Sequence, residues 1–251
     1  MGELDGRVAL ITGSSRGIGK GIAKLFAAEG AAVVVHGRDE SAVASVTSEI
    51  RQSGRAISAI CDLTEYAQIE EMRRRIEHEL GHVDVLVANA GGNPVPPGPL
   101  EDISESGWRQ TVDTNLTATF LTVKSFLPAM KARGRGTIVT MSSAASRRPT
   151  DRSPVPYAAA KAGIETLTKS IALQAGPAGV RANCIAPETI ITERTGQQIP
   201  DQVKEQLAAS HPVRRLGTPD DVARAALYLA SNQSEWVSGV TLDVAGGSVL
   251  V

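Results

Sequence analysis

Short apolar runs rich in β-branched residues alternate with longer amphipathic stretches along almost the whole chain. This alternation constrains the fold more than any other feature, because strands separated by helices are joined by crossovers that make them parallel. Runs that are apolar throughout are expected where helices cover both faces of a sheet. We therefore predict an α/β fold with a doubly wound sheet of about seven parallel strands and helices on both faces. The predicted strands are residues 8–12, 32–36, 57–61, 83–88, 136–142, 180–186 and 240–244, and the predicted helices are residues 17–29, 40–53, 65–80, 108–132, 155–175, 200–209 and 219–230.

The composition narrows the class of protein. With 251 residues, 42% of them hydrophobic, the chain can bury one sizeable core, so a single domain spanning residues 1–251 is expected. A net charge of −1 gives no electrostatic argument for binding nucleic acid or an anionic membrane, which leaves small molecules and sister subunits as partners. No stretch approaches the roughly 20 apolar residues of a membrane span, and we expect a cytoplasmic protein. Cys61 and Cys184 belong to no metal-spaced cluster, so they are interpreted as core thiols and no metal site is predicted.

A glycine-rich loop follows the first predicted strand and opens the first predicted helix. Glycines allow a tight turn there and let the backbone approach a pyrophosphate at the helix N-terminus. The spacing Gly-x-x-x-Gly-x-Gly departs from the common dinucleotide fingerprint, and by itself the loop could be an ordinary strand-to-helix connection. In a strand-loop-helix context it predicts a Rossmann-like dinucleotide site. The loop residues assigned to the cofactor are Gly13, Ser15, Arg16, Gly17, Ile18 and Gly19.

The choice between the two dinucleotides is expected at the end of the second strand, about 20 residues beyond the loop. An acidic residue there binds the ribose 2′-hydroxyl, whereas an arginine accepts a 2′-phosphate. Arg38 stands at this position and Arg16 could join it, so NADP(H) is predicted over NAD(H). Asp39 leaves an alternative, because it could cap the following helix or turn inward and favour NAD(H).

Tyr157 and Lys161 are four residues apart in a predicted helix, so they lie on one face of it. A nearby ammonium stabilises a phenolate, and we expect it to lower the tyrosine pKa from its usual value near ~10. Proton exchange with a substrate oxygen then becomes feasible. Taken alone, the pair could equally be a packed tyrosine beside a solvated lysine.

These features occur together with several others in an order that resembles the short-chain dehydrogenase/reductase family over essentially the whole chain. Within this family the chain is most similar to the 3-oxoacyl-[acyl-carrier-protein] reductase group and its relatives, which include sugar and alcohol dehydrogenases. The residues that carry the resemblance are Thr12, Gly13, Gly17, Gly19, Asp62, Asp84, Asn89, Ala90, Gly91, Asn115, Ser143, Tyr157, Lys161, Pro187, Thr192 and the segment 238–247.

The resemblance implies a role for each matching residue. Tyr157 would be the general acid/base, Ser143 would polarise the substrate carbonyl, and Lys161 would bind the nicotinamide ribose and lower the tyrosine pKa. Asn115 would hold a water that links the lysine to solvent. Asp62, with Leu63 beside it, would contact the adenine, Asn89, Ala90 and Gly91 would line the cofactor cleft, and Pro187, Thr192 and the Ile190 backbone would hold the carboxamide end.

The chain departs from the family pattern at three places. Glu188 replaces the usual glycine after the proline, which adds a carboxylate near the nicotinamide end. Ala88 replaces the first asparagine of the fourth-strand motif. The distance from Ser143 to Tyr157 is one residue longer than usual, which makes Ser142 a rival for the catalytic serine.

Basic residues suggest two partners, each with a simpler alternative. Arg147, Arg148 and Arg152 could receive an anionic substrate group or form a solvated basic loop. Lys131, Arg133 and Arg135 could dock an acidic acyl-carrier protein or favour a helix dipole. The resemblance also implies a homotetramer, and the apolar ending 249–251 could contact a sister subunit or its own.

We therefore predict an NADP(H)-dependent oxidoreductase that transfers a hydride between the nicotinamide and a small-molecule carbonyl or secondary alcohol, with a 3-oxoacyl thioester as one substrate to test. Residues 187–216 are expected to shape the substrate pocket. The alternatives are an NAD(H)-dependent sugar or alcohol dehydrogenase and a non-catalytic dinucleotide-binding sensor. The sequence does not name the substrate, the physiological direction or the stereochemistry.

Overall fold

The computed structural model describes residues 2–151 and 153–250, and its centre is a sheet of seven parallel strands. The strand order is β3-β2-β1-β4-β5-β6-β7. All neighbouring strands are parallel, and the order in which the chain adds strands switches from one side of β1 to the other at β4, which confirms the predicted doubly wound sheet. Each predicted strand is present, with its ends shifted by two residues or fewer. The strands are β1 (Val8–Ile11), β2 (Ala32–Gly37), β3 (Ala56–Ile60), β4 (Val85–Ala88), β5 (Gly136–Met141), β6 (Val180–Pro187) and β7 (Thr241–Val244).

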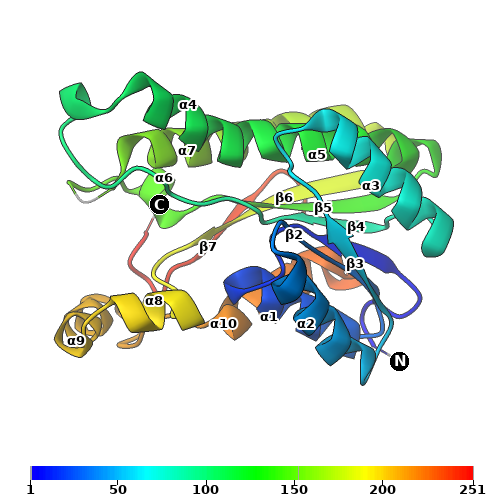
Figure 1. The fold of residues 1–251 in the computed structure, drawn as a ribbon, viewed down its shortest axis with the longest axis horizontal. Helices are drawn as coiled ribbons and strands as arrows, with labels where there is room; N and C mark the ends of the chain where they lie inside the picture. The colour runs from blue at the N-terminus through cyan, green and yellow to red at the C-terminus, as the bar shows by residue number, and fades with distance from the viewer. Residues whose placement is uncertain (1, 152, 251) are drawn as a thin grey trace.

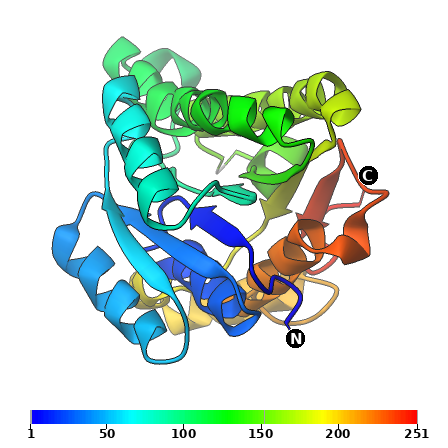
Figure 2. The ribbon, with the colours of Figure 1, turned by 90° about the vertical axis from the view of Figure 1, so that its right-hand side faces the viewer.

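Helices cover both faces of the sheet, as Figures 1 and 2 show from two directions. One layer consists of α3 (Tyr66–Glu79), α4 (Glu105–Val112), α5 (Ala118–Ala132) and α7 (Val155–Ala175). The other consists of α1 (Gly17–Ala28), α2 (Glu40–Arg51) and α10 (Pro219–Ala230). Within residues 2–151 and 153–250, no helix has the length and apolar character that crossing a membrane requires. Short 3₁₀ turns lie at η1 (Leu100–Asp102), η3 (Gly176–Ala178) and η4 (Asn232–Ser234).

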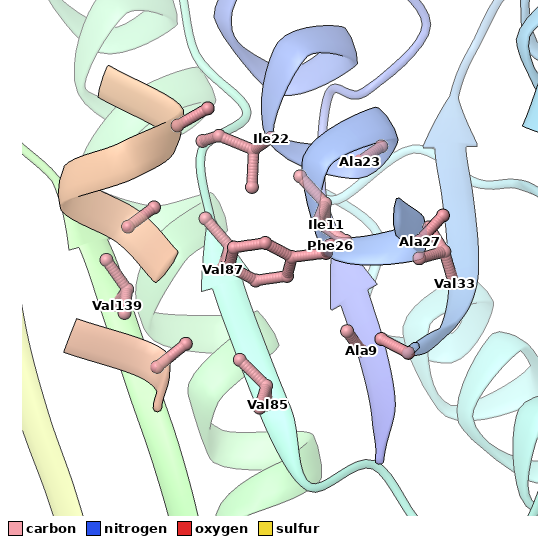
Figure 3. Packing of buried hydrophobic residues seen from close by; sticks show 14 of the residues in the cluster. Ala9, Ile11, Ile22, Ala23, Phe26, Ala27, Val33, Val85, Val87 and Val139 are labelled. Atoms are coloured by element: carbon pink, nitrogen blue, oxygen red, sulfur yellow. The ribbon is translucent and has the colours of Figure 1, made fainter. Parts of the chain in front are cut away.

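The core on the α1 side of the sheet shows why the alternation in the sequence folds this way (Figure 3). Ile22 and Phe26 are four residues apart on α1, so both face the sheet, where they pack with Ile11 and Val87. All four side chains are fully buried. Burial of each contributes roughly 1.5–3 kcal/mol, which holds the helix that carries the glycine-rich loop against the strands.

Helical segments differ from the prediction at three places. The helix predicted over 108–132 starts at Glu105 and contains a π-helical turn, η2 (Asp113–Thr117), between α4 and α5. Hydrophobic periodicity does not register one inserted residue, and π-turns of this kind frequently mark functional sites. Helices α6 (Ala144–Arg147) and α8 (Glu193–Gln198) were not predicted, because both are too short to show periodicity. Helix α9 (Asp201–Ser210) corresponds to the helix predicted over residues 200–209.

The carboxyl ends of the parallel strands share one edge of the sheet, where α6, α8 and the segment before α4 gather (Figure 1). The segment between β6 and α10 has its two ends joined by an isolated β-bridge between Ile190 and Gly217. The Gly217 amide donates to Thr189 at 3.1 Å and the Ile191 amide donates to Gly217 at 2.8 Å. A Cβ at Gly217 would lie 2.4 Å from Ile190 Cδ1, so a larger residue there would require the Ile190 side chain to move. This edge is where open α/β sheets bind ligands.

Candidate active site

Ser143 and Tyr157 meet at the carboxyl edge of the sheet. Ser143 follows β5 as the N-cap of α6, and its hydroxyl accepts a hydrogen bond from the Ala145 amide at 3.2 Å. Tyr157 lies in the first turn of α7, which begins after Pro154. A side-chain hydrogen bond joins the two hydroxyls. A substrate oxygen could therefore contact both groups at once.

Ser142, the rival serine, lies in a different environment. Its hydroxyl is 2.7 Å from Glu165 Oε1, 2.8 Å from Ser146 Oγ and 3.1 Å from the Lys161 carbonyl oxygen. The side chain is buried. These contacts assign Ser142 to the support of α7, and Ser143 is the serine next to Tyr157.

Lys161 is buried one helical turn beyond Tyr157. Its ammonium donates to the Met141 carbonyl oxygen at 2.8 Å and lies 5.4 Å from the centroid of the Tyr157 ring. Burial lowers the pKa of Lys161 to about 8. Tyr157 and Lys161 therefore share one face of α7, as predicted. The ammonium lies over the phenol ring and bonds to a backbone carbonyl oxygen.

The direction of the Tyr157 pKa shift differs from the expectation. Burial raises the pKa of Tyr157, and the hydrogen bond with Ser143 opposes this only in part. The expected lowering by Lys161 is wrong for this structure, because desolvation of the phenol dominates. Tyr157 is thus neutral at pH 7 and carries a proton that it can donate to a substrate oxygen.

Asn115 is completely buried in the π-turn η2. Its amide nitrogen donates to the carbonyl oxygens of Gly92 at 2.7 Å and Thr111 at 2.8 Å, and its Oδ1 accepts from the Gly92 amide at 3.2 Å. A Cβ at Gly91 would lie 2.5 Å from Asn115 Oδ1 and 3.4 Å from Lys161 Nζ. Asn115 Oδ1 and Lys161 Nζ therefore both lie close to Gly91.

The glycine-rich loop forms a cradle that a larger residue would fill. Gly13 and Gly17 have φ of +65° and +54°, which is the left-handed region that favours glycine. A Cβ at Gly19 would lie 2.4 Å from the Gly13 carbonyl oxygen, and one at Gly17 would lie 3.2 Å from Thr192 Cγ2. The twelve-residue helix α1 begins at the loop, so its free amides and dipole suit a dinucleotide pyrophosphate.

Asn89 connects this loop to the end of β4. Its Nδ2 donates to the carbonyl oxygens of Thr12 at 2.9 Å and Gly13 at 3.3 Å. The amides of Asn89 and Ala90 both donate to Thr12 Oγ1 at 2.9 Å. The predicted cleft residues thus adjoin the loop, whereas Leu63 is buried in one core cluster and Ile18, which is partly buried, packs against the other.

The residues expected at the adenosine end form two exposed ion pairs. Arg16 lies 3.5 Å from Asp39, and Arg38 lies 3.8 Å from Asp62. Asp39 also caps α2 by accepting from the Ala42 amide at 3.1 Å, which is one of the two alternatives open from the sequence. Ser15 lies against β2, because a Cβ at Gly37 would be 3.0 Å from its hydroxyl.

The residues expected at the nicotinamide end follow β6, whose last residue is Pro187. Ile190 is buried in the core, so only its backbone can face a ligand. The Thr192 hydroxyl caps α8 by accepting from the Thr195 amide at 3.2 Å. Glu188 lines a cavity of about 240 Å³ between β7 and residues 211–217, together with His211.

A partly buried ionic cluster behind Ser143 was not predicted. Arg147 lies 3.1 Å from both Glu165 and Asp243, and Arg148 donates to the Ser248 carbonyl oxygen at 3.1 Å. Arg147 therefore forms part of neither a solvated loop nor a free anion site, and Arg152 lies outside the described residues. The signal for Glu165 was its place one turn after Lys161 on the buried face of α7.

Cys61 and Cys184 are buried free thiols, in agreement with the sequence. Among residues 2–151 and 153–250, no three histidine, cysteine, aspartate or glutamate residues gather in a way that could hold a metal ion.

Comparison with known proteins agrees over nearly the whole chain. The family model described as "Enoyl-(Acyl carrier protein) reductase" matches residues 13–248. The 7alpha-hydroxysteroid dehydrogenase of Escherichia coli (strain K12) is 37% identical over 248 residues, which cover 98% of this chain and 96% of the relative. The 3-oxoacyl-[acyl-carrier-protein] reductase of Chlamydia muridarum is 38% identical over 244 residues, which cover 96% of each chain.

Solved structures give the same result. A gluconate 5-dehydrogenase from Burkholderia cenocepacia, in complex with NADP and tartrate, has a TM-score of 0.91 and 34% identity over 98% of this chain and 96% of its own. A 7 alpha-hydroxysteroid dehydrogenase complexed with NADH and 7-oxo glycochenodeoxycholic acid has a TM-score of 0.92 and 37% identity over 98% of this chain and 95% of its own. The chain therefore belongs to the short-chain dehydrogenase/reductase family and is an oxidoreductase that acts on alcohol or ketone groups with NAD(P)(H).

Proposed function

We propose that the protein is an NADP(H)-dependent oxidoreductase that interconverts a small-molecule carbonyl compound and the corresponding secondary alcohol. The observation that carries this proposal is the hydrogen-bonded pair Ser143–Tyr157 beside the buried ammonium of Lys161. The pair lies at the same sheet edge as a glycine cradle that fits a dinucleotide.

The roles of the side chains follow from their geometry. The bound nicotinamide supplies or accepts the hydride. In the reductive direction the Ser143 hydroxyl donates a hydrogen bond to the substrate carbonyl oxygen, which stabilises the negative charge that develops there. The neutral phenol of Tyr157 delivers its proton to the same oxygen. Lys161 then lies behind the phenol, and Asn115 holds the neighbouring Gly92 backbone in place for proton resupply.

The preference for NADP(H) is supported by Arg16 and Arg38, two guanidinium groups near the end of β2 that suit a 2′-phosphate. A second proposal, an NAD(H)-dependent sugar or alcohol dehydrogenase, is favoured by the acidic partner of each arginine. Asp39 and Asp62 partly neutralise the two cations, and both carboxylates could compete with a phosphate. Measured dissociation constants for NADPH and NADH decide between the two proposals.

A 3-oxoacyl thioester is a substrate to test first, since a reductase of this class is among the relatives. The proposed docking of an acyl-carrier protein on Arg133 and Arg135 is weakened by their position. Both lie within 3.6 Å of Asp84, just before β4, at the amino edge of the sheet and opposite the Ser143–Tyr157 pair. A free thioester is therefore the better first probe than the protein-bound form.

We also propose that residues 187–216 form the substrate-pocket region of one NAD(P)-binding domain and that the protein is a homotetramer. Support for association comes from exposed apolar side chains near the chain's end, where Leu242 on the edge strand β7 is 36% exposed and Leu250 is 87% exposed. Sedimentation analysis measures the oligomeric state directly.

The test is NADPH and NADH oxidation over a panel of ketones, diketones, keto sugars and a short 3-oxoacyl thioester. Tyr157→Phe is the matched control, because it removes one hydroxyl and keeps the partly buried ring. We expect turnover that prefers NADPH and falls about 10²- to 10⁴-fold in the variant, with cofactor binding unchanged. Cofactor binding without turnover on any substrate would instead support the non-catalytic sensor.

A further inference from the structure

His36 at the end of β2 contacts the glycine-rich loop through three hydrogen bonds, of which two use only its backbone. The Ser14 amide donates to the His36 carbonyl oxygen at 2.8 Å, and the His36 amide donates to Ser14 Oγ at 2.9 Å. The third bond uses the ring, because the Gly13 amide donates to His36 Nδ1 at 3.1 Å. A substitution of His36 therefore leaves two of the contacts available and tests the third.

The other ring nitrogen determines which tautomer is present. His36 Nε2 lies 3.1 Å from the Cys61 carbonyl oxygen, and a carbonyl can only accept, so Nε2 carries the hydrogen. Nδ1 is then a free lone pair that can accept from Gly13. The residue is 3% exposed, and burial lowers the pKa of His36 to about 4, helped by Arg38 and opposed by the Cys61 hydrogen bond and Asp62, so the ring is neutral at pH 7.

We propose that His36 is a positioning residue for the cofactor, whose ring holds the Gly13 turn against the end of β3 in the shape that receives a dinucleotide. This inference rests on the proposed role of residues 13–19 as the dinucleotide loop. The imidazole connects the loop to the Cys61 carbonyl, one residue before Asp62. It thus sets the separation of the two walls expected to hold the pyrophosphate and the adenosine.

The turn depends on this contact because of its backbone conformation. Gly13 has a φ of +65°, and its carbonyl oxygen is already held by Asn89. Without the ring acceptor, the Gly13 amide would have to find another partner, and the loop would relax. The cofactor would then bind only the fraction of molecules in which the turn re-forms, which raises the apparent dissociation constant.

Two variants separate the two ring contacts. In His36→Asn, the carboxamide oxygen takes the place of Nδ1 and can accept from Gly13, but the side chain cannot reach Cys61. In His36→Gln, the longer carboxamide can donate to the Cys61 carbonyl but leaves Gly13 without its acceptor. We expect the dissociation constant of NADPH at pH 7, measured by fluorescence titration, to stay within about threefold in His36→Asn and to rise about tenfold in His36→Gln.

Thermal unfolding and kcat distinguish positioning from general structural support. Each variant loses one ring contact, so similar losses of stability are expected in both, with kcat at saturating cofactor unchanged. His78→Asn on the exposed face of α3 is the control for a histidine substitution as such. Equal NADPH affinity in both His36 variants, or weaker binding by His36→Asn, would overturn the positioning role. If the unmodified protein bound neither NADPH nor NADH, the proposed function would fail and the inference with it.

Discussion

Glu165 provides the sharpest test of how the structure supports the Ser143–Tyr157 pair. Its carboxylate accepts hydrogen bonds from Ser146 Oγ at 2.6 Å and Ser142 Oγ at 2.7 Å, and it pairs with Arg147 at 3.1 Å. These three partners lie immediately before and within α6, which carries Ser143 as its N-cap. Replacing Glu165 should therefore loosen the position of Ser143 relative to α7.

The size of the effect follows from burial. Glu165 is 8% exposed, and breaking a buried ion pair by removing one partner costs about 3–5 kcal/mol. Because Arg147 keeps its ion pair with Asp243 at 3.1 Å, we expect Glu165→Ala to lower the free energy of unfolding by about 3 kcal/mol, the lower end of that range. Glu165→Gln keeps acceptors for both serines and loses only the charge, for which about 1–2 kcal/mol is expected.

The assay is thermal unfolding together with steady-state kinetics. A loss of about 3 kcal/mol corresponds to a fall in Tm of roughly 6–12 °C for a chain of this length. We expect kcat to fall at least about tenfold in Glu165→Ala, because a misplaced serine weakens contact with the substrate oxygen, and less in Glu165→Gln. NADPH affinity should change less than kcat, because Glu165 bonds to residues 142–147 rather than to the glycine-rich loop.

Glu71→Ala on α3 is the matched control, because its side chain is 72% exposed and pairs with Arg74 on the surface. A Tm change in Glu165→Ala no larger than in this control would refute the reasoning. So would a normal kcat in Glu165→Ala despite a large loss of stability, because it would show that Ser143 keeps its position without the cluster.

Three further predictions concern titration and charge. Burial raises the pKa of Tyr157, so kcat/KM for alcohol oxidation should increase into the alkaline range, and a plateau already reached below pH 7 would contradict the assignment. The pKa of His36 is near 6.5 in the unfolded chain and about 4 in the folded protein. Its contribution of about 3 kcal/mol to the free energy of unfolding is therefore complete above pH 6.5 and declines as the pH falls to 4. Urea unfolding of the protein and of His36→Asn between pH 4 and 7 should show this loss only in the unmodified protein. Asp39→Asn keeps a helix cap and frees Arg16, so the ratio of NADH to NADPH dissociation constants should rise several-fold, and an unchanged ratio would exclude Asp39 as a determinant.

The central strands could be predicted because they are mostly apolar runs that are buried almost throughout, whereas the edge strand β7 is partly exposed. The glycine-rich loop could be predicted from the glycines that follow the first strand, although its spatial partners His36 and Asn89 are distant in the sequence. The π-turn around Asn115 could not be read in the same way, because one extra residue leaves the apolar pattern of the long helix almost unchanged.

The electrostatics of the site could be predicted only in part. The spacing of Tyr157 and Lys161 correctly placed them on one face of α7, yet the sign of the tyrosine pKa shift depended on burial, which spacing does not report. His36 and Glu165 escaped notice for a related reason. Their partners are 23 and 18 or more residues away along the chain, at Gly13 and in the segment 142–147, so only the folded structure shows the contacts.

The bridge between Ile190 and Gly217 bears on how proteins of this architecture diversify. Both ends of the intervening segment are fixed to one another, so the chain leaves β6 and approaches α10 at a constant separation. The entropic cost of lengthening a closed loop grows only slowly with the number of residues. The residues between Thr192 and Gly217 can therefore vary in sequence and length, which would let new substrate pockets arise beside an unchanged catalytic site.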